Sequence, residues 1–564
     1  MPETRVGSVP AWLWYAVGAV AYLSFGFTEM MGSDLWWHIA AGREVLLQGT
    51  PALVDTWSYT AQGEDWHNHE WLADLVFYGW VSVFGIPSLV IWKWLLVVST
   101  FALLQRLLTR RSGVHSAALL ASVAAAAIAA PFIDMRPQLY TLLGVAVLLN
   151  LCLDRSPRLW ELLLLFVLWV NLHGGFIFGL MLLPLLVFPW SELRGQTLRR
   201  ALLLVGASAA VCLINPDGIG VFTLPLVYAL DSSSPYRSIG EWRSPLISGG
   251  IESPAYLYTL VLAVALAASW VLPRVRRVVG FHPAVLGMAL LTAAMSMTSR
   301  RFIVLWALAF AALAAPFLAL VLRQALGRRL ALPLALAVLA LGVWRMAPYS
   351  LRPAVAYHYL TAEYVYPEAL VDVIELNGLA GNTFAYYNWG GYLHWRTDGA
   401  LKVFIDGRAN TVYDDQTYLD YVAVLRAGPG WLERIENSGA MFFLWPHSRG
   451  GGRLIRGLLD TGRWVKLFED QRGALLARRD QPLPPTLRRP RDSVAADLAA
   501  VYQHFRAGRY EAALSHASRA HDTRPWDFSA CRWLKRSLQA VGRSEDGARV
   551  TEDCRGYFAS RYLD

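Results

Sequence analysis

Long apolar runs separated by short polar segments dominate the chain from residue 10 to residue 347. A helix that crosses a bilayer needs about 20 consecutive, mostly apolar residues. Runs close to that length cover residues 10–28, 87–106, 114–132, 137–153, 159–173, 175–190, 199–214, 254–272, 281–298, 301–322 and 329–347. We therefore expect residues 1–348 to form a polytopic α-helical membrane module with about 11 transmembrane helices.

Arginine clusters occupy alternate connections between these runs. They comprise Arg106, Arg110 and Arg111, then Arg199 and Arg200, then Arg274, Arg276 and Arg277, and finally Arg328 and Arg329. Because cytoplasmic loops are enriched in Lys and Arg, this pattern predicts that residues 29–86, residues 215–253 and the chain after residue 348 lie outside. We expect a multi-pass protein of the inner (plasma) membrane with an extracytoplasmic C-terminal domain.

The composition supports a membrane protein and argues against other classes. Only 16% of the residues are charged, whereas soluble domains carry about 25%. The net charge of +9 could suit nucleic acid, but the arginines lie between apolar runs, so we expect no nucleic-acid partner. The sequence contains no Walker A motif and no GxSxG motif, which argues against nucleotide-driven transport and serine hydrolysis.

The C-terminal part of the chain is more polar and has a different periodicity. Strands are expected over residues 380–395, 401–406 and 440–445, and helices over residues 367–377 and 417–427. This pattern predicts an extracytoplasmic α/β domain over residues 349–480. A Pro-rich, charged linker follows over residues 481–492.

Residues 493–564 are predicted to form a short tail of helical hairpins. Its residues Tyr502, Gly508 to Tyr510, Ala512 to Leu514, Ala517, Ala520 and Pro525 resemble one tetratricopeptide repeat and part of a second. About three repeats are normally needed for independent stability, so we expect the tail to dock on the α/β domain. It could bind a protein partner or act as a packing cap. Cys531 and Cys554 in this tail could form a disulfide or remain thiols.

The first external loop, residues 29–86, is the segment richest in candidate chemistry. Asp34 stands at the start of an expected amphipathic helix, which carries Trp36 and Trp37 and would lie at the membrane interface. The loop also holds His38, Arg43, His67, His69 and Glu70. A carboxylate at position 34 can act as a general base, bind a metal or cap the helix.

This arrangement resembles the GT-C superfamily of membrane glycosyltransferases, and in particular its oligosaccharyltransferases. In those enzymes the first external loop begins with an acidic residue, which Asp34 matches, and continues into an interfacial helix. A second acidic motif of the family lies at the end of the third span, where this chain has Asp134. The family has a pair of acids there, and this chain has one. The resemblance implies an enzyme that uses lipid-phosphate-linked sugars.

A third match lies early in the predicted α/β domain, where segment 384–393 is followed by segment 402–408. Oligosaccharyltransferases carry a Trp-Trp-Asp-Tyr-Gly motif there, and then a strand with an Asp at similar spacing. Asn388 replaces the acid that holds the acceptor sequon in the family, so acceptance of Asn-X-Ser/Thr peptides does not carry over. A strand–turn–strand in which Gly390 and Gly391 need positive φ is the alternative interpretation.

Arginines at the external ends of the predicted spans suit a lipid phosphate, because guanidinium groups bind phosphate through two parallel hydrogen bonds. Arg300 and Arg301 lie opposite the basic loops, and snorkelling at a short turn is the alternative explanation for them. We predict catalytic roles for Asp34, Asp134 and Glu70. The predicted substrate-binding residues are His38, Arg43, His69, Arg136, His173, Arg300, Arg301, Asn388, Trp389, Asp406 and Arg408.

The predicted function is transfer of a sugar from a polyprenyl-phosphate-linked donor to an extracytoplasmic acceptor, with membrane lipids as further partners. No cofactor is firmly indicated. A divalent metal is left open, because Asp134 is a single acid and histidines would have to complete the ligand set. The alternative function is a non-enzymatic transporter or envelope-assembly scaffold. Transporters tend to have internal repeats and sites near the midplane, whereas this chain shows no clear repeat and concentrates its acids in loops.

Overall fold

The computed structural model describes residues 10–28, 30, 32–153, 155–190, 193–223, 225, 233–247, 254–325, 330–347 and 365–555. The arginine pair 328–329, the expected start of the α/β domain at 349–364 and the end of the tail at 556–564 lie outside the described residues. The chain divides into two compact units. Unit 1 comprises Met1–Thr28 and Val90–Met346, and unit 2 comprises Glu29–Leu89 and Ala347–Asp564. The first loop therefore folds with the C-terminal part of the chain.

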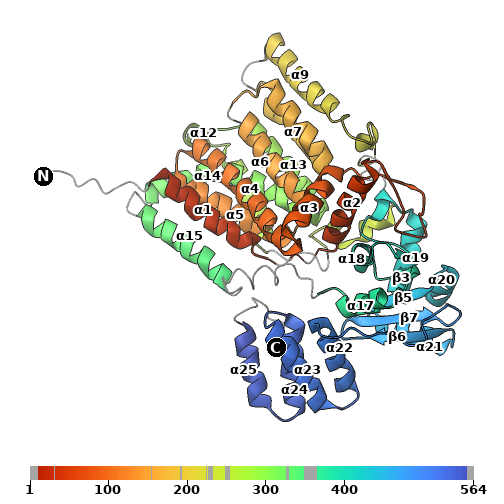
Figure 1. Ribbon diagram of the computed structural model, residues 1–564. Helices are drawn as coiled ribbons and strands as arrows, with labels where there is room; N and C mark the ends of the chain where they lie inside the picture. The colour runs from red at the N-terminus through yellow and green to blue at the C-terminus, as the bar shows by residue number, and fades with distance from the viewer. Residues whose placement is uncertain are drawn as a thin grey trace. The chain divides into compact units, whose positions relative to one another are not determined.

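Unit 1 is built from helices, and each predicted apolar run coincides with one of them (Figure 1). The helices are α1 (Ala11–Gly26), α4 (Leu89–Ser112), α5 (His115–Ala129), α6 (Gln138–Cys152), α7 (Leu159–Leu172), α8 (Phe176–Val187), α9 (Gly195–Val211), α11 (Pro254–Ser269), α12 (Pro273–Val279), α13 (Pro283–Thr298), α14 (Ile303–Ala325) and α15 (Ala331–Met346). Helix α14 packs on α5 and α13, and α1 packs on α5 and α15. Short 3-10 turns join some of them: η2 (Ala130–Phe132), η3 (Pro235–Ser238), η4 (Gly240–Trp242) and η5 (Arg300–Phe302).

Helix length supports fewer complete membrane spans than the sequence predicted. Among the described residues, segments 86–112, 115–132 and 300–323 are long and apolar enough to cross a membrane. The pair 255–269 and 273–279 is a fourth candidate, bent by 106°. Several other helices of unit 1 are apolar but have 17 residues or fewer, because they end a few residues inside the predicted apolar runs.

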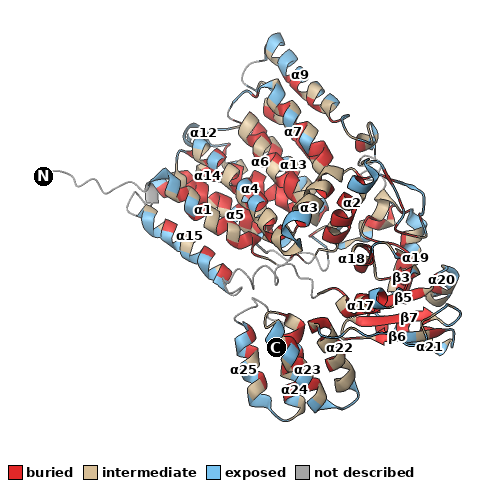
Figure 2. Ribbon diagram, in the orientation of Figure 1, coloured by how far each residue is buried: buried red, intermediate tan, exposed pale blue. Residues whose placement is uncertain are grey.

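The surface of unit 1 carries many large apolar side chains. On α11, Val261 and Val264 are 72% and 71% exposed, and on α15, Trp344 is 70% exposed. Figure 2 shows exposed positions along α15. Soluble monomers rarely expose such surface over neighbouring turns of a helix. These helices therefore have a face that is suited to an apolar surrounding.

Unit 2 contains a five-stranded sheet in the order β4-β3-β5-β7-β6. The strands are β3 (Gly381–Ala385), β4 (Leu401–Val403), β5 (Phe442–Pro446), β6 (Trp464–Glu469) and β7 (Gly473–Arg478), and the helices around them are α17 (Glu368–Leu376), α18 (Gly390–Arg396), α19 (Asp415–Leu425), α20 (Trp431–Asn437) and α21 (Gly451–Asp460). β3 is parallel to β4 and β5, and β7 is antiparallel to β5 and β6. Every residue of β5 is buried, as its continuous apolar sequence requires of a central strand.

Elements of the first loop complete unit 2. They are α2 (Asp34–Gln48), β1 (Leu53–Val54), β2 (Asp65–Trp66), α3 (Trp71–Phe84) and η1 (Ile86–Ser88). Trp36 is 1% exposed, and its ring meets those of Tyr366 and Tyr392 edge-on at centroid distances of 5.3 and 4.8 Å. Trp37 is also buried. The predicted placement of these tryptophans at a membrane interface is therefore wrong, because aromatic residues of the C-terminal domain cover Trp36.

The predicted strand over residues 380–395 is correct only in its first half. β3 ends at Ala385, and Gly390 begins α18 with a φ of −55°. The strand–turn–strand interpretation is thus wrong, and close approach explains the glycines instead. A Cβ at Gly390 would lie 2.4 Å from the Cβ of Asp406, and one at Gly391 would lie 2.9 Å from the backbone nitrogen of Trp37.

The tail forms α22 (Val494–Arg506), α23 (Tyr510–Thr523), α24 (Phe528–Ala540) and α25 (Ser544–Arg555). It docks on the sheet domain, since Ala495 and Ala499 of α22 belong to that domain's core and Arg506 pairs with Glu469 of β6 at 3.0 Å. A disulfide joins Cys531 to Cys554 across α24 and α25, and it resolves the alternative that the sequence left open.

Removing this disulfide should loosen the last hairpin. The bond joins residues 23 positions apart. Closing a loop of this size stabilises the folded state by about 3 kcal/mol in the chain-entropy model. We expect Cys531→Ser to make α25 sensitive to limited proteolysis at temperatures where the wild-type tail is resistant. Cys152→Ala, which removes a buried free cysteine, is the control and should leave the cleavage pattern of the tail unchanged. Equal resistance of Cys531→Ser and wild type would contradict the expectation.

Candidate active site

Gly42 lets α2 and α3 approach each other closely. A Cβ at this position would lie 2.1 Å from the backbone oxygen of Asp74, so a larger residue would push the helices apart. The approach brings His38, one turn earlier on α2, to the Asp74 carboxylate of α3. Asp34 lies a further four residues back, so it lies on the same face of α2 as His38.

Asp34, His38, Glu70 and Asp74 form an acid–imidazole cluster. His38 Nδ1 lies 2.5 Å from Asp74 Oδ1, and the second oxygen of Asp74 accepts a hydrogen bond from Asn68 Nδ2 at 2.9 Å. His38 Nε2 faces Glu70 Oε2 at 3.7 Å. His38 is 2% exposed and Asp74 is fully buried. The imidazole is therefore held from one side by Asp74 and presents its other nitrogen to Glu70.

The carboxylates around His38 favour its protonated form. Burial alone would lower the pKa of the imidazole, but Asp74, Glu70 and Asp34 outweigh burial and raise this pKa above 6.5. Burial also raises the pKa of the Asp74 carboxyl, although His38 and Asn68 act to lower it. The cluster can therefore store a proton and stabilise negative charge at the acids beside it.

Asp34 lies at the entrance of this cluster, as the first residue of α2. Its Oδ1 accepts a hydrogen bond from Ser33 Oγ at 3.2 Å. A Cβ at Gly407 would lie 3.1 Å from the same oxygen, so the backbone of segment 406–408 runs beside the carboxylate. Asp34 is only partly buried, which leaves it more accessible than His38 or Asp74.

A second group, the arginine cluster, consists of Asp55, Asp406, Arg408 and Tyr413. Arg408 Nη1 donates to Asp55 Oδ1 at 2.6 Å, and its Nη2 donates to Asp406 Oδ2 at 2.8 Å and to the Tyr413 hydroxyl at 2.9 Å. The guanidinium also lies 4.4 Å from the ring centroid of Trp57. The side chains of all three ion-pair members have no exposed surface.

This burial favours a structural role for Asp406 and Arg408 over the predicted contact with substrate. Three other predicted substrate-binding residues of unit 2 differ in their exposure and contacts. Asn388 is exposed in η9 (Tyr387–Trp389), whereas Trp389 is buried. Arg43 pairs with Asp398 at 3.0 Å and lies 5.0 Å from the ring centroid of Trp395.

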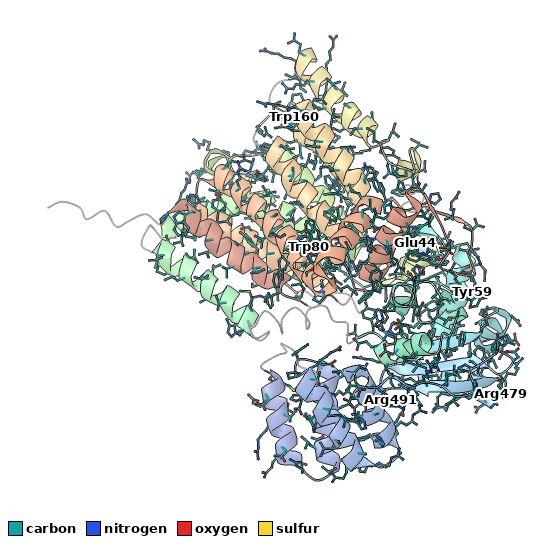
Figure 3. The ribbon with its side chains drawn as sticks, viewed as in Figure 1. Glu44, Tyr59, Trp80, Trp160, Arg479 and Arg491 are labelled. Carbon is teal, nitrogen blue, oxygen red and sulfur yellow. A yellow bond between two sulfur atoms is a disulfide. The ribbon has the colours of Figure 1, made fainter. Side chains whose placement is uncertain are left out.

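His69 extends the acid–imidazole cluster toward solvent. Its Nε2 lies 3.6 Å from Glu70 Oε1, and its side chain is 28% exposed. A line of charged and polar groups thus runs from the buried Asp74 through His38 and Glu70 to His69. Another buried imidazole, that of His394, lies 3.8 Å from the carboxylate of Glu44 (labelled in Figure 3), at the other end of α2.

In unit 1, Arg136 forms an ion pair with Glu241 of η4. The guanidinium of Arg301 lies 4.9 Å from the ring centroid of Trp242, which follows Glu241 in the sequence. Burial alone would raise the pKa of Glu241, but Arg136 and Arg301 outweigh burial and lower this pKa. The predicted phosphate-binding residues Arg136 and Arg301 are thus gathered around one loop carboxylate.

The other predicted residues of unit 1 are Arg300, Asp134 and His173. Arg300 donates its backbone N–H to the carbonyl of Arg243 at 3.1 Å. Asp134 Oδ1 accepts from the backbone nitrogen of Met135 at 2.7 Å. His173 belongs to a separate buried group, in which its Nδ1 lies 2.7 Å from Thr141 Oγ1 and accepts from the Gly175 nitrogen at 2.9 Å. That acceptor role assigns the imidazole proton to Nε2.

Sequence reasoning missed Asp74, Asn68 and Asp55 as parts of these clusters. Asp74 follows Glu70 by four residues, as His38 follows Asp34, and this shared helical spacing could have identified it. Asp55 offered no such signal, because its partner Arg408 lies 353 residues away.

The described residues provide one tight group of potential metal ligands, formed by His521, Cys531 and Cys554. Both cysteines are consumed by the disulfide, so they offer no thiolate. In that group the ligand atoms all lie within 4.8 Å of one another. Among the described residues, the acid–imidazole cluster does not bring three ligand atoms that close together. Its donor set therefore does not fit a compact, preformed metal centre.

Replacing Arg408 by Met should destabilise unit 2 strongly, because two buried carboxylates would lose their partner. Breaking a buried ion pair from one side costs about 3–5 kcal/mol. Arg434→Gln is the matched control, since its pair with Asp420 is partly exposed and should be worth at most about 1 kcal/mol. Thermal unfolding of the purified full chain measures both. Similar melting temperatures for the two variants would rule out the proposed importance of the arginine cluster.

The stability contributed by His38 should depend on pH. Because its folded-state pKa is raised, protonation stabilises the fold fully below its ordinary value of 6.5, and this contribution is lost as the pH rises through the raised pKa. The difference in melting temperature between wild type and His38→Gln should therefore be largest in acid and shrink on the alkaline side. His67→Gln, at an exposed position, should show no such trend. A difference that grows with pH would refute the assignment.

Comparison with known proteins supports the architecture. No protein family and no curated protein sequence matches the chain. The solved oligosaccharyltransferase of Archaeoglobus fulgidus, tethered with an acceptor peptide containing the NVT sequon via a disulfide bond, has a similar structure, with a TM-score of 0.52 and 11% identity over 84% of this chain and 75% of that one. An identity this low is evidence of fold alone. The chain therefore has a fold similar to that of this oligosaccharyltransferase, which agrees with the architecture that the sequence resemblance predicted.

Proposed function

We propose that the chain is a membrane glycosyltransferase that transfers a sugar from a polyprenyl-phosphate-linked donor to an extracytoplasmic acceptor. The observation that carries the proposal is the acid–imidazole cluster on a fold similar to that of an oligosaccharyltransferase. A partly exposed carboxylate beside a buried, oriented imidazole is a suitable general base.

The surface of unit 1 supports a membrane location. Its apolar side chains on α11 and α15 suit contact with lipid tails. Trp160 at the start of α7, labelled in Figure 3, is 58% exposed, and tryptophan favours the headgroup level of a bilayer. The disulfide of the tail supports an extracytoplasmic position for unit 2, because disulfides persist in oxidising compartments.

In the proposed reaction, Asp34 removes a proton from the nucleophilic group of the acceptor. The electron pair of that group attacks the anomeric carbon of the sugar while the bond from this carbon to the phosphate oxygen breaks. The bonding electrons leave on the polyprenyl phosphate. His38, held by Asp74, lies between the acids and fixes their arrangement.

Within unit 1, Arg136 and Arg301 are proposed to bind a lipid phosphate. Both guanidinium groups act on the carboxylate of Glu241, so the structure already holds an anion at this place. Two guanidinium groups around one carboxylate also suit a phosphate, which carries negative charge on several oxygens. The donor atoms of the acid–imidazole cluster do not form a compact metal centre among the described residues, so the proposed reaction relies on the side chains of the protein.

Asp34→Asn tests the mechanism. Amide replacement keeps the size of the side chain and removes the base, so turnover of a polyprenyl-phosphate-linked sugar in membranes should fall by about 100-fold or more. The measurement is release of radiolabelled sugar from the lipid into any acceptor fraction. Folding is checked by the melting temperature, which should change little because Asp34 is partly exposed.

Asp65→Asn is the matched control, because Asp65 is an exposed acid of the same loop and should retain wild-type turnover. Unchanged turnover in Asp34→Asn would remove the proposed mechanism. Absence of turnover in the wild type with all lipid-linked sugars tested, together with transport of the lipid or recruitment of an assembly partner, would favour the transporter or scaffold alternative.

A further inference from the structure

Lys93 is a fully buried lysine within the apolar helix α4. Lysine is costly at such a position, and ionisable residues inside membrane helices normally have a specific purpose. Its Nζ donates to the backbone oxygen of Thr28 and to Thr28 Oγ1, both at 2.8 Å. Lys93 takes no part in the proposed reaction.

Lys93 and its neighbour Trp94 together hold the end of α1. Trp94 Nε1 donates to the backbone oxygen of Gly26 at 3.1 Å, and its ring stacks on Phe27 at a centroid distance of 4.9 Å. The last carbonyls of a helix lack partners within the helix, and a cation is favourable at this negative end of the helix dipole. Consecutive residues of α4 thus fix the point where the chain leaves α1.

The same contact extends to the segment that carries Asp134. The hydroxyl of Thr28 accepts from Lys93 and donates to the backbone oxygen of Ile133 at 3.4 Å. Ile133 immediately precedes Asp134. The ammonium group is therefore linked through one side chain to the backbone beside a predicted catalytic acid.

We propose that Lys93 is a positioning residue, which acts through Thr28 to fix the exit of α1 and the segment that carries Asp134. Asp34 follows Thr28 by six positions in the sequence. The role assigned to these acids rests on the proposed glycosyltransferase function. The physical claim, that Lys93 orders segment 130–137 through the hydroxyl of Thr28, stands apart from it.

Lys93→Met tests the claim, since it preserves an unbranched apolar side chain and removes the ammonium. Hydrogen–deuterium exchange of the detergent-solubilised full chain should become at least threefold faster in peptides covering 24–30 and 130–137, and remain unchanged in α19. In turnover assays, kcat should fall about tenfold while KM for the lipid-linked sugar stays within twofold, because positioning acts on the reacting groups rather than on lipid binding.

Thr28 provides a second, milder pair of variants in case Lys93→Met does not fold. Thr28→Val removes the hydroxyl at nearly constant shape and should accelerate exchange in 130–137, whereas Thr28→Ser keeps the hydroxyl and should restore wild-type exchange and kcat. Gln105→Met is the matched control. Gln105 is equally buried on α4 and donates to the Trp14 oxygen of α1 at 3.0 Å, but it should not affect segment 130–137.

Wild-type exchange in 130–137 for both Lys93→Met and Thr28→Val would overturn the proposal. So would equal loss in Thr28→Val and Thr28→Ser, since the hydroxyl would then be irrelevant. If the wild type lacks turnover altogether, the glycosyltransferase function fails, and the exchange measurements still decide whether Lys93 orders the segment.

Discussion

The buried ion pair between Arg408 and Asp55 joins parts of the chain that lie 353 residues apart. Each charge stabilises the other in this buried site, because an unpaired buried ion costs several kcal/mol or more. The pair therefore fixes the first loop on the sheet domain. Backbone contacts follow the same line: Val403 of β4 donates to the oxygen of Trp57 at 3.0 Å, and Tyr59 donates to that of Val403 at 3.2 Å. The loop thus also covers the edge strand of the sheet, where unpaired backbone groups would otherwise invite association.

The acid–imidazole cluster depends on this attachment. Segment 406–408 begins with a partner of Arg408 and passes beside Asp34 at Gly407. On the other side, Gly42 brings α3 and its carboxylate to His38. The partly exposed acid is consequently set between a rigid backbone segment and a buried imidazole. Catalytic groups need such support, because small displacements from a reactive geometry cost much of the rate.

Local patterns in the sequence predicted the elements well where they are independent of distant partners. The apolar runs became helices, and the apolar segment near Phe443 became a central strand, because these features depend on composition over a few turns. Prediction failed where a distant segment decides the outcome. Trp36 was predicted to lie at a membrane interface but is covered by Tyr366 and Tyr392. Gly390 was considered as a turn residue, but a glycine is needed there because the Cβ of Asp406 leaves no room for a side chain. For the site, Asp34 and Glu70 were predicted as catalytic and His38 as substrate-binding, and all three belong to one cluster of the first loop. Arg408 was predicted to bind substrate and is enclosed by protein groups.

The covering of Trp36 has a consequence for biosynthesis. Its partner Tyr366 follows it by 330 residues, and Tyr366 also donates its hydroxyl to the oxygen of Gly32 at 3.2 Å. At about 5–20 residues per second, the ribosome needs roughly 17 to 66 seconds to supply that partner. During this interval the aromatic face of α2 has no native cover, while the helices between the two segments are being made. The first loop is thus among the earliest parts of the chain to be made and among the last to reach its final packing.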